Sequence, residues 1–481
     1  MIRKSASAFP RSLHERSILL ALTLAAAALR FWAPGAKGLW YDESLTAAMT
    51  QLSPAEIVRF HWQAAFTHLP GWYLFTNGWA RVFGTSEYAL RLPSVMAGIA
   101  AVPLFWQLLR TTRPSDRGLR LIATALLVGS PLLVLYSQEA RMYSLALALA
   151  LASFYLFVRL TTHEQIGLLI ALLLVNWAMI ALQYYYALLI GIEGLFLTLR
   201  IIRRRSRPLP LLAVLVASLL PLLWRGLSPG FWGTANALAT SGHNTGNLPT
   251  LLDAAWRDLT FGMVIWRPPQ AAIGYLLVAP ALMGLIFASR RRAHLDTGCS
   301  ESTAIRWPGL FLLTIFTAGS ITALLPEHFQ IRYVLYIAPL LLAFIALGIV
   351  ETWRRLRPAG ALLFVATLAV AGSGLYYYFT AYQRSEYREM ARYLGEHAHP
   401  GSVVLLEGPR QHLLADYYLP KDLKFEPIPD VPLPAHLPVD APLVVPAEVD
   451  RQLKPLLEAE PELWLILAGE NEVDPGEFVL S

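Results

Sequence analysis

Two adjacent carboxylates, Asp42 and Glu43, follow closely on a long apolar run near the N-terminus. They belong to the stretch KGLWYDESLTAAM, residues 37–49, and lie next to the aromatic residues Trp40 and Tyr41. A carboxylate can act as general base on a hydroxyl or an amine. Acidic residues are also favourable in the first turn of a helix, so helix capping is the alternative interpretation of this pair.

Other polar residues gather in short segments between apolar runs. They are Gln138, Glu139 and Arg141 in YSQEARMY (136–143), Arg332 and Tyr333 in EHFQIRY (327–333), Tyr185 in LQYYYA, and His68 in the first polar loop. Arginines and a histidine can bind a phosphate and stabilise it as a leaving group. Taken alone, Glu139 and Arg141 are typical of a surface ion pair, and His68 of a hydrogen-bonded structural histidine.

The composition indicates that membrane helices must position these residues. The chain has 481 residues, of which 56% are hydrophobic and only 15% are charged, whereas soluble proteins carry about 25% charged residues. A transmembrane helix needs about 20 apolar residues, and we therefore expect an α-helical polytopic membrane protein with about eleven spans. The predicted spans are 17–34, 88–109, 119–137, 142–160, 165–183, 186–202, 209–225, 271–289, 308–325, 333–351 and 359–379.

The distribution of Lys and Arg predicts how these helices are oriented. With a cytoplasmic N-terminus, the inner segments hold 21 Lys and Arg, and the outer loops before the C-terminal segment hold eight. This bias follows the positive-inside rule. We expect a multi-pass protein of the cytoplasmic (inner) membrane whose C-terminal segment is periplasmic or extracellular. A signal peptide is the alternative interpretation of the first apolar run, but no clean cleavage site precedes a polar start.

The sequence divides into two predicted domains. Residues 1–379 carry a net charge of +16 and form the transmembrane domain, whereas residues 380–481 carry −10. In this second part, the strand patterns SVVLLEG and ELWLILAG alternate with helical patterns, and the Pro-rich stretch 427–446 is a connection. They predict a small α/β domain at the outer face. The overall charge of +6 thus reflects basic cytoplasmic loops, and no nucleic-acid partner is expected.

All the candidate residues fall on the outer side in this topology. The first outer loop, residues 35–87, holds the acidic pair and His68, and its segment 70–83 is apolar but too short to span, which predicts an interfacial helix. Carboxylates, arginines, a histidine and tyrosines therefore meet at the depth of the lipid headgroups. Together they suit glycosyl transfer from a lipid-linked sugar phosphate, since its phosphate would lie there beside its isoprenoid tail.

At these residues the sequence resembles the GT-C glycosyltransferases, specifically the bacterial relatives of protein O-mannosyltransferases and lipid A aminoarabinose transferases. The resemblance covers most of the membrane domain. It rests on LWYDES, on HLPGWYLFTNGWARVFGTSEYALRLPS (68–94), on SPLLVLYSQEARMYSLALALA (130–150) and on RYVLYIAPLLLAFIALGI (332–349). The family implies a polyprenyl-phosphate sugar donor, an outward-facing site, and inversion at the anomeric carbon.

Carried over to this sequence, the family pattern assigns the general base to Asp42 and a supporting, acceptor-binding role to Glu43. Family members often have Lys or His before Pro-Pro near the donor phosphate, and here His68-Leu69-Pro70 lacks one of the two prolines. The resemblance implies a donor phosphate bound by Arg141, Arg332 and His68, in a cleft that also contains Gln138, Glu139, Tyr41, Tyr333 and Tyr185.

The expected partners are membrane lipids, the lipid-linked donor, and a glycan, lipid or protein acceptor. No spacing of His, Cys and Asp is typical of a metal site, so no cofactor is predicted, and a divalent cation held by carboxylates stays open. One alternative is a transporter, which would need polar groups near the bilayer midplane, where the interior acids reduce to Glu193. Others are a non-catalytic subunit of envelope polysaccharide assembly, and a ligase that moves a whole glycan from a lipid pyrophosphate.

Overall fold

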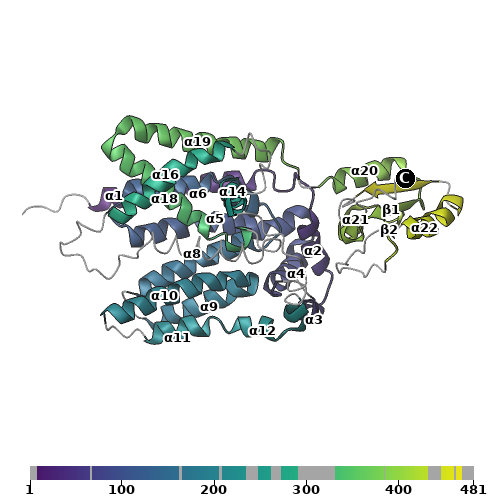
Figure 1. Ribbon diagram of the computed structural model, residues 1–481, viewed down its shortest axis with the longest axis horizontal. Helices are drawn as coiled ribbons and strands as arrows, with labels where there is room; N and C mark the ends of the chain where they lie inside the picture. Colours follow the sequence, from purple (N-terminus) through teal and green to yellow (C-terminus); the bar gives the residue numbers. More distant parts are fainter. Residues whose placement is uncertain are drawn as a thin grey trace, which may run out of the picture. The chain divides into compact units, whose positions relative to one another are not determined.

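The structure is a computed structural model, and it is mostly helical (Figure 1). It describes residues 8–64, 68–161, 165–204, 209–233, 248–261, 272–290, 331–383, 385–431, 446–459 and 462–467. The chain forms two compact units. Unit 1 comprises Met1–Ala33, Val58–Trp72 and Arg91–Tyr382, and unit 2 comprises Pro34–Ile57, Tyr73–Leu90 and Gln383–Ser481.

Unit 1 consists of helices whose residues are largely apolar. They are α1 (Ala8–Phe31), α5 (Glu87–Thr112), α6 (Arg117–Val128), α7 (Pro131–Ser137), α8 (Tyr143–Leu160), α9 (Ile166–Leu182), η1 (Tyr184–Tyr186), α10 (Ala187–Arg204), α11 (Leu209–Ala217), α12 (Pro221–Leu227), α14 (Leu248–Phe261), η3 (Ala272–Leu277), α16 (Val278–Arg290), η6 (Ile331–Val334), α18 (Ile337–Arg355) and α19 (Arg357–Thr380). Two further helices, α3 (Pro54–Gln63) and α4 (Gly71–Phe83), have residues in both units. Most of these bounds agree with the predicted spans to within a few residues.

The number of membrane spans stays a prediction. Within the described ranges, five helices are long and apolar enough to cross a membrane, or six if α6 and α7 together form one span. The predicted spans 165–183, 186–202 and 271–289 correspond to shorter apolar helices, and the predicted span 308–325 lies outside the described residues. The apolar helices nevertheless indicate a membrane protein.

The predicted span 119–137 is broken in the structure rather than straight. The axes of α6 and α7 differ by 52°. The break has a local cause, because Gly129 ends α6 and the hydroxyl of Ser130 accepts the backbone N–H of Leu133 at 3.4 Å as the N-cap of α7. Pro131 then occupies the first turn of α7, where its missing N–H costs nothing. The bend leads directly into the segment that contains Gln138, Glu139 and Arg141.

Helices α16 and α18 pack side by side at very short range (Figure 1). A Cβ atom added to Gly348 would lie 1.9 Å from the carbonyl oxygen of Pro280, and one added to Gly284 would lie 1.9 Å from that of Phe344. Each helix therefore contributes a glycine that allows the two backbones to touch, as is common between membrane helices.

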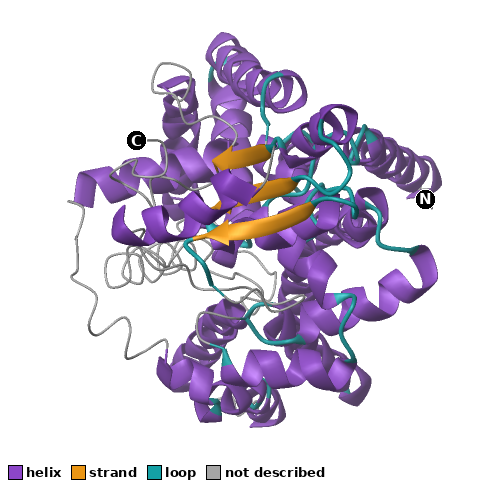
Figure 2. Cartoon of the chain, turned by 90° about the vertical axis from the view of Figure 1, so that its right-hand side faces the viewer, coloured by secondary structure: helices purple, strands orange, loops and turns teal. Residues whose placement is uncertain are grey.

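Unit 2 contains a parallel sheet of three strands in the order β2-β1-β3 (Figure 2). Its elements are α2 (Tyr41–Met49), α20 (Tyr387–His397), β1 (Val403–Glu407), η7 (Pro409–Gln411), α21 (His412–Tyr418), β2 (Lys424–Ile428), α22 (Pro446–Ala459) and β3 (Leu463–Leu467). In register, Val403 of β1 pairs with Lys424 of β2 and with Leu463 of β3. The central strand β1 is buried along its whole length, as parallel strands usually are.

The two strands that the sequence predicts are present as β1 and β3. Strand β2 and helix α22 were not expected, and part of the predicted connection 427–446, residues 432–445, lies outside the described residues. Strand β2 contains Pro427, which an edge strand tolerates. The predicted domain boundary after residue 379 stays a prediction, since the C-terminal segment forms one unit with two parts of the first outer loop.

The contact between α16 and α18 yields the first prediction. Replacing Gly348 by alanine should lower the stability of the protein by about 1–3 kcal/mol, because the added methyl group overlaps the backbone of α16. Gly372→Ala in α19 is the matched control, since a Cβ atom there meets nothing within 4 Å. Thermal unfolding of the purified variants in detergent measures the difference, and equal melting temperatures would contradict this packing.

Candidate active site

Two buried arginines of unit 1 meet at one tyrosine ring. The guanidinium carbon of Arg332 lies 5.5 Å from the ring centroid of Tyr143, and that of Arg141 lies 5.9 Å from the same centroid. Arg332 also lies 5.7 Å from the ring of Tyr333. The side chains of Arg141 and Arg332 are only 3% and 7% exposed. Positive charge is thus concentrated within a largely buried aromatic environment.

Short irregular segments between helices position these groups. Arg141 lies in the turn from α7 to α8, and its carbonyl oxygen accepts a hydrogen bond of 2.8 Å from the hydroxyl of Ser94 in α5. Tyr143 is the first residue of α8, and Arg332 and Tyr333 belong to η6, a single short turn before α18. Residues near helix ends can direct their side chains toward one common site, which is why these two motifs converge.

His68 and Tyr185 join this cluster. The ring centroids of His68 and Tyr333 lie 5.5 Å apart in an edge-on arrangement, and His68 is 6.1 Å from Tyr184. Tyr185 stacks on Tyr333 with centroids 5.3 Å apart and an interplanar angle of 3°. Five residues named from the sequence, the arginines included, therefore gather in unit 1. We call Arg141, Arg332, His68, Tyr143, Tyr185 and Tyr333 the cationic cluster.

The surroundings of His68 keep its imidazole neutral at pH 7. Burial is the main cause of the lowered pKa of His68, and the positive charges of Arg141 and Arg332 lower it further. His61 and Arg225 act in the same direction. A neutral imidazole can still donate one hydrogen bond to an anion. An anion bound beside it would raise the pKa of the imidazole and favour its protonated form.

The sequence analysis left Tyr143 and Asp258 out of the site. Tyr143 closes the YSQEARMY motif, so the motif itself contained the signal. Asp258 lies on α14, and burial raises the pKa of its carboxyl to about 6, although the charges of Arg257 and Arg332 lower it. This electrostatic coupling places Asp258 in the neighbourhood of Arg332. Its only sequence signal was an acid in a loop rich in aromatic residues.

Gln138 and Glu139 differ from the arginine that follows them. The amide nitrogen of Gln138 donates to the carbonyl oxygens of Arg30 at 3.0 Å and Trp32 at 2.9 Å, and its amide oxygen accepts the hydroxyl proton of Tyr378 at 2.8 Å. These bonds tie the end of α1 to α19 and argue for a structural role of Gln138. Glu139 is 3% exposed and is buried among the helices of unit 1.

The acidic pair begins helix α2 of unit 2. Trp40 is the N-cap residue, and the fully buried Glu43 accepts the backbone N–H of Trp40 at 3.4 Å, as an acid at the third helical position does in a capping box. Asp42 is half-buried in the first turn, as is Tyr41. The two carboxylates therefore have different surroundings, since one of them caps the helix.

Each unit thus offers one part of a possible reaction. The cationic cluster can bind an anion such as a phosphate, and Asp42 can accept a proton. Within the described part of the chain, no group of three or more His, Cys, Asp and Glu side chains could hold a metal ion.

The lowered pKa of His68 yields the second prediction. The unfolded chain, in which histidine has a pKa of about 6.5, takes up a proton more readily than folded His68. The free energy of unfolding should therefore fall as the pH decreases from 7 to 5. His68→Gln should reduce this slope by up to about 1.4 kcal/mol per pH unit. Melting temperatures of both proteins at pH 7, 6 and 5 measure the slopes, and parallel slopes would refute a neutral His68.

Solved structures of membrane enzymes share the architecture of this chain. An oligosaccharyltransferase from Archaeoglobus fulgidus, in its apo form, has a TM-score of 0.53 and 12% identity over 89% of this chain and 66% of that protein. ArnT from Cupriavidus metallidurans, in its apo state, has a TM-score of 0.56 and 13% identity over 87% of this chain and 86% of that one. The same ArnT bound to undecaprenyl phosphate has a TM-score of 0.56 and 12% identity, with the same coverage.

The comparisons agree on the fold and not on a closer relationship. No protein-family model matches the sequence, and no curated protein matches it either. The chain spans just under two thirds of the length of the archaeal oligosaccharyltransferase. At 12–13% identity the structural likeness concerns the fold alone. The chain has the fold of the GT-C glycosyltransferases, as its sequence motifs indicated.

Proposed function

We propose that the protein is an integral-membrane, inverting glycosyltransferase. It transfers a monosaccharide from a polyprenyl-phosphate donor to a glycan, lipid or protein acceptor at the outer face of the cytoplasmic membrane. The observation that carries the proposal is the convergence of Arg141 and Arg332 on the ring of Tyr143. Further support comes from ArnT, which shares the fold and has been solved with undecaprenyl phosphate.

The cationic cluster suits a lipid phosphate better than a free sugar. Guanidinium groups bind phosphate oxygens through charge-assisted hydrogen bonds. The apolar helices of unit 1 offer an environment for an isoprenoid chain. Because Arg141 and Arg332 are buried, their attraction for an anion is stronger than it would be in water.

The proposed reaction is a single displacement. The acceptor oxygen or nitrogen forms a bond to the anomeric carbon while the bond from that carbon to the phosphate oxygen breaks. The electron pair of the broken bond stays on the phosphate, where Arg141 and Arg332 stabilise the growing negative charge and His68 donates a hydrogen bond. The acceptor proton passes to the carboxylate of Asp42. Attack opposite the leaving group inverts the anomeric configuration.

We assign the two acidic residues to different roles. Asp42 is the base because it is half-buried in the first turn of α2 and its carboxylate is not needed as the cap of that helix. Glu43 holds the first turn through the N–H of Trp40 and thereby orients Asp42. Tyr185 and Tyr333, stacked face to face, would form one wall of the sugar site.

Loss of the proposed base is the third prediction. Asp42→Asn should reduce transfer about 10²–10⁴-fold, the usual contribution of a general base, while Glu56→Gln, an exposed carboxylate of the same loop, should leave transfer unchanged. The assay supplies a panel of radiolabelled polyprenyl-phosphate monosaccharides to purified protein in lipid. It follows release of polyprenyl phosphate. A transporter or a non-catalytic subunit would release none, and a ligase would require a pyrophosphate-linked glycan.

The fourth prediction concerns the donor phosphate. Arg141→Ala and Arg332→Ala should each lower kcat/KM for the donor about 10–100-fold, because each removes charge-assisted hydrogen bonds to the phosphate. Arg159→Ala is the matched control, since its guanidinium carbon lies 5.9 Å from the ring of Tyr155, away from the cluster. Loss of activity in all three variants alike would show that the effect is not specific to the cluster.

A further inference from the structure

The C-terminal segment of unit 2 holds the backbone of Leu39 from two sides. The hydroxyl of Tyr418 accepts the N–H of Leu39 at 2.6 Å, and the hydroxyl of Ser385 donates to the carbonyl oxygen of Leu39 at 2.5 Å. Leu39 itself is fully buried. It directly precedes Trp40, the N-cap residue of α2, so both polar groups of this peptide position are fixed just before the acidic pair.

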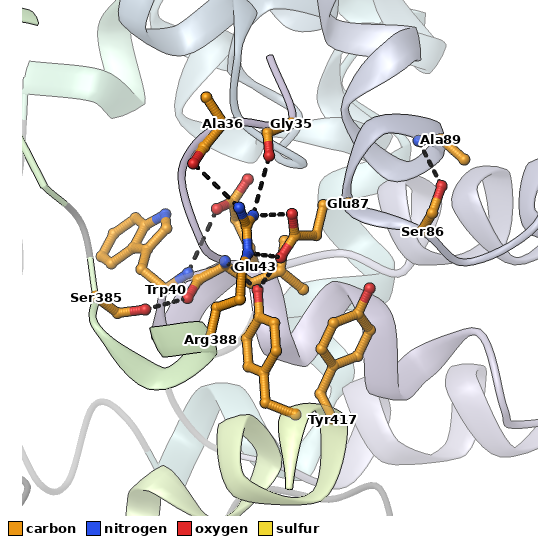
Figure 3. A network of polar contacts seen from close by, with 12 residues as sticks. Gly35, Ala36, Trp40, Glu43, Ser86, Glu87, Ala89, Ser385, Arg388 and Tyr417 are labelled. Atoms are coloured by element: carbon orange, nitrogen blue, oxygen red, sulfur yellow. Dashed lines mark hydrogen bonds and ion pairs between the residues drawn. The ribbon is translucent and has the colours of Figure 1, made fainter. Parts of the chain in front are cut away.

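Glu87 links the same contacts to an arginine. The hydroxyl of Tyr418 donates its proton to the carboxylate of Glu87, and Arg388 forms an ion pair with both oxygens of that carboxylate (Figure 3). Burial raises the pKa of Tyr418, and the hydrogen bond to Glu87 raises it further. Tyr418 therefore stays protonated, so that it can donate to Glu87 and accept from Leu39 at the same time.

Arg388 extends the network along the loop toward Leu39. It donates to the carbonyl oxygen of Ala36 at 3.1 Å and to that of Gly35 at 3.0 Å (Figure 3). A planar guanidinium can serve a carboxylate and two carbonyl groups at once, which an ammonium group does not do in the same geometry. Three side chains of the C-terminal segment, Ser385, Arg388 and Tyr418, thus hold residues 35–39.

Gly38 fits closely within this network. A Cβ atom there would lie 3.4 Å from both the carbonyl oxygen and the hydroxyl of Ser385, and 3.6 Å from the hydroxyl of Tyr418. The loop and the two hydroxyl groups are therefore in close contact. A segment with this many directed hydrogen bonds has little freedom to move.

We propose that Ser385, Arg388 and Tyr418 are positioning residues that fix residues 35–40 and thereby the start of α2, where Asp42 lies. The C-terminal domain thus acts on the reaction through the orientation of the base and not by contact with the substrate. This inference rests on the proposed function, because it concerns the base of that reaction. A misplacement of about 1 Å in a reacting group is enough to slow catalysis strongly.

The fifth prediction tests this role with Tyr418→Phe, which removes one hydroxyl group and keeps the ring. We expect kcat to fall about tenfold, the usual effect of losing one well-placed hydrogen bond, while KM for the donor changes less than twofold. Amide hydrogen exchange of residues 35–40 in the full-length protein should become faster. Ser385→Ala, which removes the other hydroxyl group at Leu39, should act in the same way if Tyr418→Phe does not fold.

Tyr417→Phe is the matched control. Its hydroxyl donates to the carbonyl oxygen of Thr85 at 2.9 Å and does not contact residues 35–40 (Figure 3). Transfer and hydrogen exchange of this variant should both equal those of the wild type.

Each outcome of the experiment decides one part of the inference. Unchanged hydrogen exchange in Tyr418→Phe and Ser385→Ala would overturn the claim that the network holds the loop. Faster exchange with unchanged kcat would overturn the claim that the held loop positions the base. A wild-type protein that transfers no sugar would overturn the proposed function and the positioning role with it, whereas hydrogen exchange would still decide whether the C-terminal segment holds the loop.

Discussion

Two guanidinium groups buried at one tyrosine ring are the feature on which the rest of the structure depends. Burying such a charge among apolar helices is costly unless hydrogen-bond acceptors or an anion lie beside it. Arg30, also buried, shows a structural solution, since it donates to the hydroxyl of Ser137 at 3.2 Å and to the carbonyl oxygen of Val128 at 3.3 Å. Arg141 and Arg332 instead converge from two distant motifs, which is the arrangement expected of an anion site.

The acidic pair shows how a helix start can serve chemistry and structure together. Glu43 is fully buried and binds the backbone N–H of Trp40, so that it stabilises α2. Asp42 is thereby left for another role one position earlier. The backbone immediately before the pair is held by hydroxyl groups whose positions depend on α21 and on Ser385. Two parallel uses of hydrogen bonding, one local and one long-range, therefore define the orientation of the proposed base.

The sequence predicted what depends on local patterns. Long apolar runs set most helix bounds, and the two motifs around Arg141 and Arg332 marked residues that lie together in the structure. It failed where partners are distant. The bonds of Gln138 to Arg30 and Tyr378 join positions 108 and 240 residues apart, and those of Leu39 reach residues 346 and 379 positions away. No spacing rule predicts such contacts. Strand β2 was missed because a proline and charged residues hide its pattern.

The measurement that tests the central claim most directly is an experimental structure of the protein in lipid with polyprenyl phosphate bound. The account predicts that the phosphate oxygens lie about 3 Å from guanidinium nitrogens of both Arg141 and Arg332, with the imidazole of His68 beside them and the isoprenoid chain along the helices of unit 1. A phosphate bound elsewhere, with Arg141 and Arg332 still packed on Tyr143, would contradict the account.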